Sequence, residues 1–129
     1  MKSILIVEDE AISAILLRKL LEKDFEVDVA QNATDCLKFG RSKVYNICIL
    51  DINLGKGSQD GKELLSHFKA DPKYVNSKFL AITAYALPGD KEKYIEMGFD
   101  QYFSKPIVFE EVITTIKSLA EDGTVGANS

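Results

Sequence analysis

Carboxylates, a hydroxyl and an ammonium stand where short apolar segments of this chain end. Glu8, Asp9 and Glu10 follow residues 4–7, Asp51 follows residues 47–50, Thr83 follows residues 79–82, and Lys105 comes just after residues 102–103. Carboxylates about 4 Å apart repel by roughly 4 kcal/mol per pair at an effective dielectric near 20, so such a cluster needs a cation or protons. Because the ligands are all oxygen, Mg²⁺ is favoured over zinc.

Together these groups indicate a site for phosphoryl transfer onto an aspartate. Mg²⁺ keeps several waters and commonly shares its site with phosphate oxygens. Lys105 and the Thr83 hydroxyl would serve the remaining phosphoryl oxygens, and a carboxylate such as Asp51 can act as the nucleophile. Each residue taken singly has an ordinary structural explanation, as a helix cap or a solvated side chain. Their joint occurrence after successive segments favours a site.

The elements that must position these residues are five apolar, β-branched segments separated by helical patterns. Residues 4–7, 47–50 and 80–82 are apolar throughout, which is typical of parallel strands covered on both faces. Val27 and Val29 alternate with acidic residues, which indicates an edge strand. The alternation predicts an α/β fold, a single parallel sheet with helices on both faces. Ligands of such sheets bind at the carboxyl ends of the strands, where the polar residues stand.

The helical segments show apolar faces and end signals. Over residues 10–23, Ile12, Leu16 and Leu20 recur every four residues, with Leu17 and Leu21 beside them, which predicts the core-facing stripe of a helix. We expect one domain over residues 2–120 and a flexible tail over residues 121–129. Further end signals are Asn32 as an N-cap, Pro72 beyond the third helix, Pro88 in the first turn of the fourth, and Gly98 after its end.

Composition narrows the class of protein. The 129 residues are 46% hydrophobic and carry a net charge of −4, which argues against a disordered chain and against nucleic-acid binding. No apolar stretch approaches the roughly 18 residues that span a bilayer, and residues 4–7 are too short for a signal peptide. Cys36 and Cys48 lack metal-ligand spacing and are predicted to be buried thiols. We therefore expect a soluble cytoplasmic domain that binds no membrane.

The five segments and their polar residues resemble the receiver domain of two-component response regulators over about residues 2–120. The resemblance implies a flavodoxin-like (βα)5 fold with strand order 2-1-3-4-5. The matching motifs are ILIVEDE at residues 4–10, ILDIN at 49–53, Asp60-Gly61, AITA at 81–84 and YFSKP at 102–106.

The resemblance implies a role for each matched residue of the acidic site. Asp51 would accept a phosphoryl group from a histidine kinase or a histidine phosphotransfer protein. Glu8 and Asp9 would hold Mg²⁺ together with Asp51 and the backbone carbonyl of Asn53. The chain would be a phosphoacceptor regulator rather than an enzyme, catalysing only its own phosphotransfer and slow dephosphorylation.

Other matched residues would carry the response. Thr83 and Lys105 would bind phosphoryl oxygens, Tyr102 would be the switch aromatic, and the bond before Pro106 would be cis. Phosphorylation would change the face formed by the fourth helix, fifth strand and fifth helix, through which the chain would regulate a partner protein, as a monomer or as a dimer formed by that face. Since the chain ends after the last helix, output would pass through protein contact or a domain absent from it. Residues 54–61 depart from the usual family pattern, and we expect them to form a longer, glycine-bearing loop.

Two alternatives remain open. A phosphohydrolase of the haloacid-dehalogenase type also uses a strand-end aspartate, Mg²⁺, a hydroxyl and a lysine. It needs a second aspartate two residues after the nucleophile as a general acid, and Asn53 occupies that place. The other alternative is a pseudo-receiver that binds partners without phosphorylation, which the complete acid, threonine and lysine set disfavours.

Overall fold

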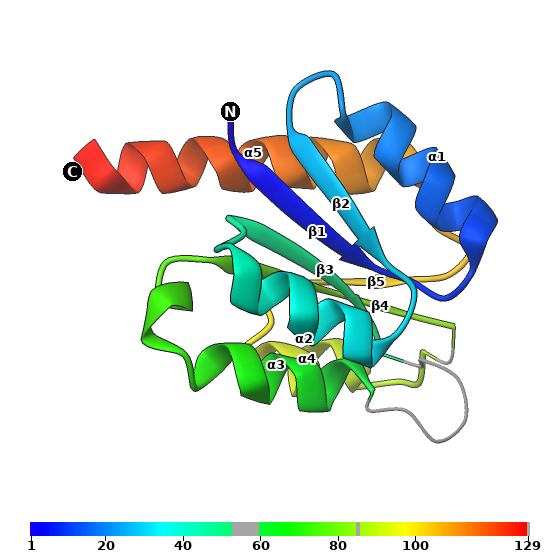
Figure 1. The fold of residues 1–129 in the computed structure, drawn as a ribbon. Coiled ribbons are helices and arrows are strands. Elements are labelled where there is room, and N and C mark those ends of the chain that lie inside the picture. Colours follow the sequence, from blue (N-terminus) through cyan, green and yellow to red (C-terminus); the bar gives the residue numbers. More distant parts are fainter. Residues whose placement is uncertain (53–59, 85, 129) are drawn as a thin grey trace.

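The strands form one parallel sheet in a computed structural model that describes residues 1–52, 60–84 and 86–128, with side chains described only as far as residue 121. The strand order is β2-β1-β3-β4-β5 (Figure 1). This order confirms the predicted flavodoxin-like fold. The strands are β1 (Ser3–Val7), β2 (Glu26–Ala30), β3 (Ile47–Asp51), β4 (Lys78–Thr83) and β5 (Gln101–Ser104).

Helices cover both faces of the sheet (Figure 1). One face carries α1 (Ala11–Leu21) and α5 (Phe109–Asn128). The opposite face carries α2 (Ala33–Ser42), α3 (Gly61–Lys69) and α4 (Asp90–Met97), and a short 3-10 helix, η1 (Pro72–Tyr74), follows α3.

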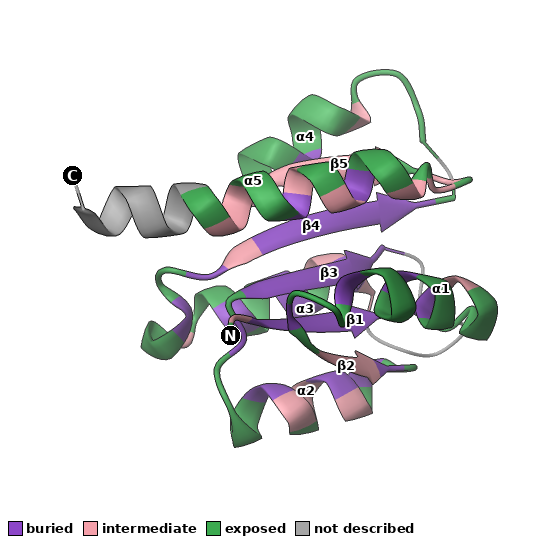
Figure 2. Ribbon diagram, turned by 90° about the horizontal axis from the view of Figure 1, so that it is seen from above, coloured by how far each residue is buried: buried purple, intermediate pink, exposed green. Residues whose placement is uncertain are grey.

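The central strands are buried because successive side chains point to opposite faces and both faces are covered. Ile4 and Ile6 of β1 pack in the cluster beneath α1 and α5, whereas Leu5 and Val7 pack in the cluster on the other face. All four are 0% exposed. Figure 2 shows β1 and β3 buried along their length, and β4 buried except at its start, between helices whose outer sides are exposed.

The helix ends follow local side-chain chemistry. Asn32 caps α2 as predicted, since its Oδ1 accepts from the backbone N–H of Asp35 at 2.8 Å. Gly98 ends α4 with a φ of 121°. The prediction for the start of α4 is wrong by two residues: Pro88 lies outside the helix. Gly89 follows it at a φ of 85°, a left-handed conformation that turns the chain before Asp90 begins the helix.

The predicted inner face of α1 is only partly right: Leu17 and Leu21 are buried as predicted, whereas three other residues of the predicted stripe are exposed. Ile12, Leu16 and Leu20 are 72%, 43% and 43% exposed. The buried residues of the helix are Ala14, Leu17 and Leu21. These buried residues have a helical spacing similar to that of the exposed ones. The side of α1 that faces the sheet is the one that carries the small Ala14, and the row of larger residues spaced four apart faces outward.

The C-terminal helix is longer than the sequence pattern indicated. Its backbone is helical to Asn128, although we expected the last helix to end near residue 120. The division into a domain over residues 2–120 and a flexible tail over residues 121–129 stays a prediction. Val112 and Ile116 of this helix are both 0% exposed and pack against the sheet.

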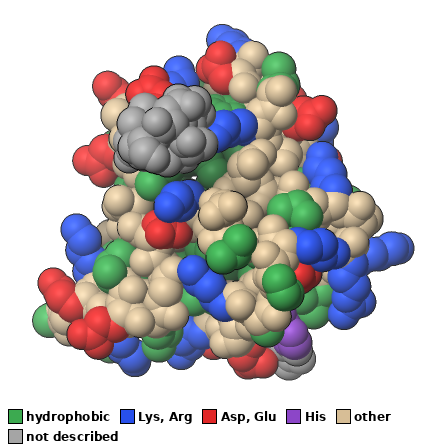
Figure 3. Space-filling view, turned by 90° about the vertical axis from the view of Figure 1, so that its left-hand side faces the viewer, with side chains coloured by type: hydrophobic (Ala, Val, Ile, Leu, Met, Phe, Trp, Pro, Cys, Tyr) green, Lys and Arg blue, Asp and Glu red, His purple; other side chains and the backbone are tan. Residues whose placement is uncertain are grey.

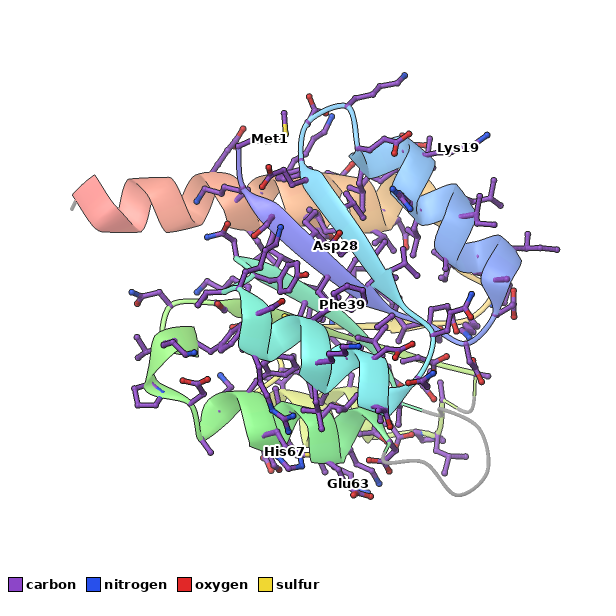
Figure 4. The ribbon with its side chains drawn as sticks, viewed as in Figure 1. Met1, Lys19, Asp28, Phe39, Glu63 and His67 are labelled. Carbon is purple, nitrogen blue, oxygen red and sulfur yellow. The ribbon has the colours of Figure 1, made fainter. Side chains whose placement is uncertain are left out.

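The two cysteines are buried as predicted, and the surface carries side chains of mixed type. Cys36 and Cys48 are free and buried. His67 lies on α3, exposed on the outside of the fold (Figure 4). At the end of the molecule where the strands begin, basic, acidic and single hydrophobic side chains are interspersed (Figure 3). Among the described residues, no helix combines the length and the apolar character that crossing a bilayer requires.

Candidate phosphoryl-transfer site

The ends of three strands bring Glu8, Asp51 and Lys105 into direct contact. The ammonium nitrogen Nζ of Lys105 lies 2.9 Å from Oε1 of Glu8 and 3.0 Å from Oδ2 of Asp51. The two carboxylate side chains are each 3% exposed, and the lysine side chain is 18% exposed. One half-buried cation therefore faces two buried anions, which explains how the acidic pair is tolerated in the fold.

Strand register explains why residues distant in sequence meet here. Val7 of β1 is level with Leu50 of β3, so the residues that follow them, Glu8 and Asp51, emerge side by side. Strand β5 is paired with β4 to its last residue, and the backbone N–H of Lys105 donates to the carbonyl oxygen of Thr83 at 2.8 Å. The Lys105–Pro106 peptide bond is cis, the isomer that the resemblance implied.

A third carboxylate completes a group that fits a hard metal ion. One ligand oxygen from each of Glu8, Asp9 and Asp51 lies within 4.8 Å of the others. Asp9 is exposed, so the group opens to solvent on one side. All three donors are oxygens, which suits Mg²⁺. Glu10 does not belong to this group: its Oε1 accepts from the Ser13 hydroxyl at 2.5 Å. The proposed ligand Asn53 lies outside the described residues.

Burial makes Glu8 hold its proton more strongly than an ordinary glutamate. Desolvation is the main cause that raises the pKa of Glu8 from 4.5 to about 8, and the neighbouring Asp51 adds to it. Lys105 opposes this rise. Desolvation lowers the pKa of Lys105, but its contacts with the two carboxylates outweigh that effect and raise the pKa above its usual value. The site without a metal ion is thus relieved by one ammonium and, below about pH 8, by a proton on Glu8.

The two residues of the predicted switch lie on neighbouring strands. Thr83 ends β4 and is 2% exposed. Tyr102 of β5 stacks on Tyr94 of α4, with ring centroids 5.4 Å apart and an interplanar angle of 14°. Its hydroxyl is buried and has no hydrogen-bond partner among the described residues. Burial is also the first cause of the raised pKa of Tyr102.

Gly61 has a packing role that composition and spacing did not reveal. The family resemblance included it only as part of the Asp60-Gly61 motif. A Cβ atom at Gly61 would lie 2.7 Å from the backbone oxygen of Asp51 and 3.1 Å from the Cα of Ile52. The N–H of Gly61 donates to the Ile52 carbonyl at 3.2 Å. The start of α3 is therefore seated directly against the strand end that carries Asp51, which only glycine permits.

We predict that Gly61→Ala lowers the free energy of unfolding by about 1–3 kcal/mol, since backbone atoms must shift to admit the methyl group. Urea denaturation measures the change. The control is Ser66→Ala on the exposed side of the same helix, where a change within about 0.5 kcal/mol is expected. Equal stability of Gly61→Ala and the wild type would contradict the close packing.

A shallow groove of about 510 Å³ adjoins Lys105. Ser13 and Leu16 of α1 line one side, and Pro106 and Ile107 line the other. Leu16 is 43% exposed, so a large apolar side chain is accessible in the groove that Lys105 also lines. Because the sequence pattern predicted that Leu16 is buried, it did not indicate this surface.

The comparisons with known proteins agree with this geometry. The model of the response regulator receiver domain family matches residues 4–117. A polar-differentiation response regulator, DivK of Brucella anthropi, is 34% identical over 122 residues, which cover 94% of this chain and 98% of that protein. The chain therefore belongs to the response regulator receiver domain family.

Solved structures of the family share the fold. A CheY-like receiver domain protein from Methanospirillum hungatei superposes with a TM-score of 0.84 at 27% identity, over 98% of each chain. The receiver domain of a DNA-binding response regulator from Colwellia psychrerythraea gives a TM-score of 0.84 at 26% identity, over 94% of this chain and 99% of that one. Phosphorylation on an aspartate and Mg²⁺ binding at an acidic pocket characterise this family of two-component signalling domains, so the chain is a phosphorylation-regulated signalling domain.

Proposed function

We propose that this chain is a signalling switch that accepts a phosphoryl group on Asp51 from a histidine kinase or a histidine phosphotransfer protein. The observation that carries the proposal is the ammonium of Lys105, which lies within 3.0 Å of both buried carboxylates at the carboxyl edge of the sheet. This contact supports the proposal, because phosphoryl transfer to a carboxylate requires a nucleophile and a phosphoryl-binding cation close together.

In the proposed transfer, an Oδ atom of Asp51 forms a bond to phosphorus while the bond from phosphorus to the donor nitrogen breaks. Lys105 binds one phosphoryl oxygen, and the Thr83 hydroxyl donates to another. Glu8, Asp9 and Asp51, with the carbonyl of Asn53, would hold Mg²⁺, which supplies positive charge for the phosphoryl oxygens. Because Lys105 already faces Asp51, it needs little movement to meet the new group.

We propose that the output passes through Thr83 and Tyr102 to the face formed by α4, β5 and α5. When Thr83 binds the phosphoryl group, Tyr102 changes its position beside α4. The stacking of Tyr102 on Tyr94 supports this route, because it links β5 directly to α4. Phosphorylation shifts the equilibrium only as far as the phosphoryl group contacts one state better than the other.

The test is incubation of the full chain with acetyl phosphate and MgCl₂, followed by mass spectrometry and a phosphate-release assay. A single phosphoryl group on Asp51 that decays slowly supports the switch. Rapid, repeated hydrolysis of phosphate esters would instead support the haloacid-dehalogenase-type hydrolase. Absence of labelling would support the pseudo-receiver. The protein would act in the cytoplasm through protein partners, as a monomer or as a dimer formed by the α4, β5 and α5 face.

The exposed α1 residues beside the site supply a contact for the donor protein. We predict that Leu16→Asp slows transfer from a phosphorylated protein donor by about tenfold, because a charge replaces an apolar contact worth about 1–2 kcal/mol. The rate with acetyl phosphate should stay unchanged, since Asp51, Thr83 and Lys105 are intact. Rapid-quench assays with both donors measure the two rates. Equal slowing with both donors would contradict a docking role.

A further inference from the structure

The outer side of α1 carries an apolar strip that the described part of the fold leaves exposed. Ile15 is 54% exposed, and it lies on α1 beside Ile12, Leu16 and Leu20, which are exposed as well. Residues three or four apart are neighbours on the surface of a helix, so these four side chains form a continuous surface, the α1 strip. Figure 2 shows that most of α1 is exposed. Contiguous exposed apolar residues mark an interaction surface, whereas single ones are ordinary.

The two ends of α1 carry opposite charges. Asp9 and Glu10 precede the first helical residue, whereas Lys19 lies in the last turn and Lys23 follows the end, and all four are exposed. Acids at the N-terminus and bases at the C-terminus also suit the dipole of the helix itself. The dipole does not explain the apolar residues between them. An apolar centre between an acidic and a basic end is complementary to the same helix in the reversed direction.

Lys19 is placed to take part in such a contact. It follows Ile12 by seven residues and Leu16 by three, so it lies on the same side of the helix as the α1 strip. Figure 4 shows its side chain pointing away from the molecule. Within the described residues Lys19 makes no ion pair, whereas the neighbouring Arg18 is already paired with Glu22 at 3.6 Å. Lys19 therefore offers a cation that the described fold does not neutralise.

We propose that the α1 strip binds the α1 strip of a second copy of this chain, with the two helices antiparallel. A two-fold axis at the centre of the pair makes the contact self-complementary, since each contact between two residues occurs twice. With Ile12 of one copy level with Leu16 of the other, the residues three positions further out, Asp9 and Lys19, also come level. The apolar side chains then bury one another between two pairs of opposite charges.

A parallel arrangement of the two helices is disfavoured by charge. It would set Asp9 beside Asp9 and Lys19 beside Lys19 of the second copy, and like charges at neighbouring positions are destabilising. An unrelated partner would need an apolar strip with a basic and an acidic end in the matching order. A second copy supplies that order by reversal alone, so it is the occupant that the charges favour.

The helices are short, so the dimer should be weak. Each α1 contributes 11 residues. Contacts of this size lie at the lower limit of specific interfaces, and we expect a dissociation constant of about 0.1 mM. Leu16 also lines the groove beside Lys105, so a second copy would cover the surface proposed above for the phosphodonor protein, and the two partners would exclude each other. Only that consequence rests on the proposed function.

The experiment is sedimentation velocity of the full chain between about 10 µM and about 1 mM, in a chelator that keeps the acidic end of α1 free of metal ions. The sedimentation coefficient should rise with concentration, and dilution of the ¹⁵N-labelled chain should shift the amides of α1 most. Ile12→Ser and Lys19→Glu should each raise the dissociation constant about fivefold or more, since one removes apolar contact and the other sets acid against acid. Ile12 is 72% exposed, so its replacement leaves the fold intact.

The matched control is Lys91→Glu, which changes the net charge by the same amount at an exposed site on α4, on the opposite face of the sheet. It should change the dissociation constant by about twofold at most. Any of four results would overturn the proposal: a constant sedimentation coefficient over the whole range, unchanged association of Ile12→Ser, equal weakening by Lys91→Glu and Lys19→Glu, or dilution shifts centred on α4, β5 and α5. Because no phosphodonor is present, failure here leaves the proposed phosphorylation of Asp51 untouched.

Discussion

Replacing Lys105 by methionine should lower the free energy of unfolding by about 2–4 kcal/mol at pH 9.5 in a chelator, since two buried carboxylates lose their cation. The distances of 2.9 and 3.0 Å to Glu8 and Asp51 make this lysine the principal neutralising group of the site. At pH 5 the loss should be clearly smaller, because Glu8 then carries a proton and the remaining charge is halved. Methionine keeps most of the apolar stem, so packing is little changed.

Urea denaturation of the wild type and Lys105→Met at pH 5 and pH 9.5 measures this effect. The control is Lys117→Met, which removes a 3.6 Å ion pair with Asp24 whose side chains are 54% and 56% exposed. Exposed pairs contribute about 0–1 kcal/mol, so this variant should change little at either pH. An equal loss for Lys105→Met at both pH values would show that packing, rather than charge, is responsible. The variant should also accept phosphate from acetyl phosphate far more slowly.

Replacing Asp51 by asparagine should have the opposite effect on stability and abolish labelling. In a chelator at pH 9.5, where Glu8 is ionised, we expect the thermal midpoint to rise by about 3 °C or more, equivalent to about 1 kcal/mol, because one of two crowded negative charges is removed. The pair of Glu8 and Lys105 remains. A lower midpoint in the variant would contradict the crowding of charges.

The pH dependence gives a second readout of the same variant. The pKa of Glu8 is about 8 in the folded chain and 4.5 ordinarily, so between these values the unfolded chain has released a proton that the folded chain retains. Raising the pH through this window therefore favours unfolding, by at most about 1.4 kcal/mol per pH unit from this group. Because Asp51 contributes to the raised pKa, Asp51→Asn should flatten the decline. Asp24→Asn, at an exposed site, should leave the slope unchanged.

The sequence alone predicted the layout of the sheet and the membership of the acidic site. Apolar segments such as residues 47–50 can be buried only in a sheet covered on both faces, and the carboxyl ends of parallel strands lie at one edge. Glu8, Asp51 and Lys105 could therefore be placed together without coordinates. The strand order came with the family resemblance and not from periodicity.

Only the tertiary structure decided which side of α1 faces the sheet. The rows through Leu16 and through Leu17 are both apolar and both have helical spacing, so periodicity cannot separate them. Packing chose the row that contains the small Ala14, which lets the helix lie close to the strands, and it left Leu16 exposed beside Lys105. The raised pKa of Glu8, the close packing of Gly61 and the groove beside Lys105 likewise depend on distances between segments far apart in the chain. Residue types and spacing determine which groups reach one edge of the sheet, whereas burial and contact set their charge states and the surfaces left free.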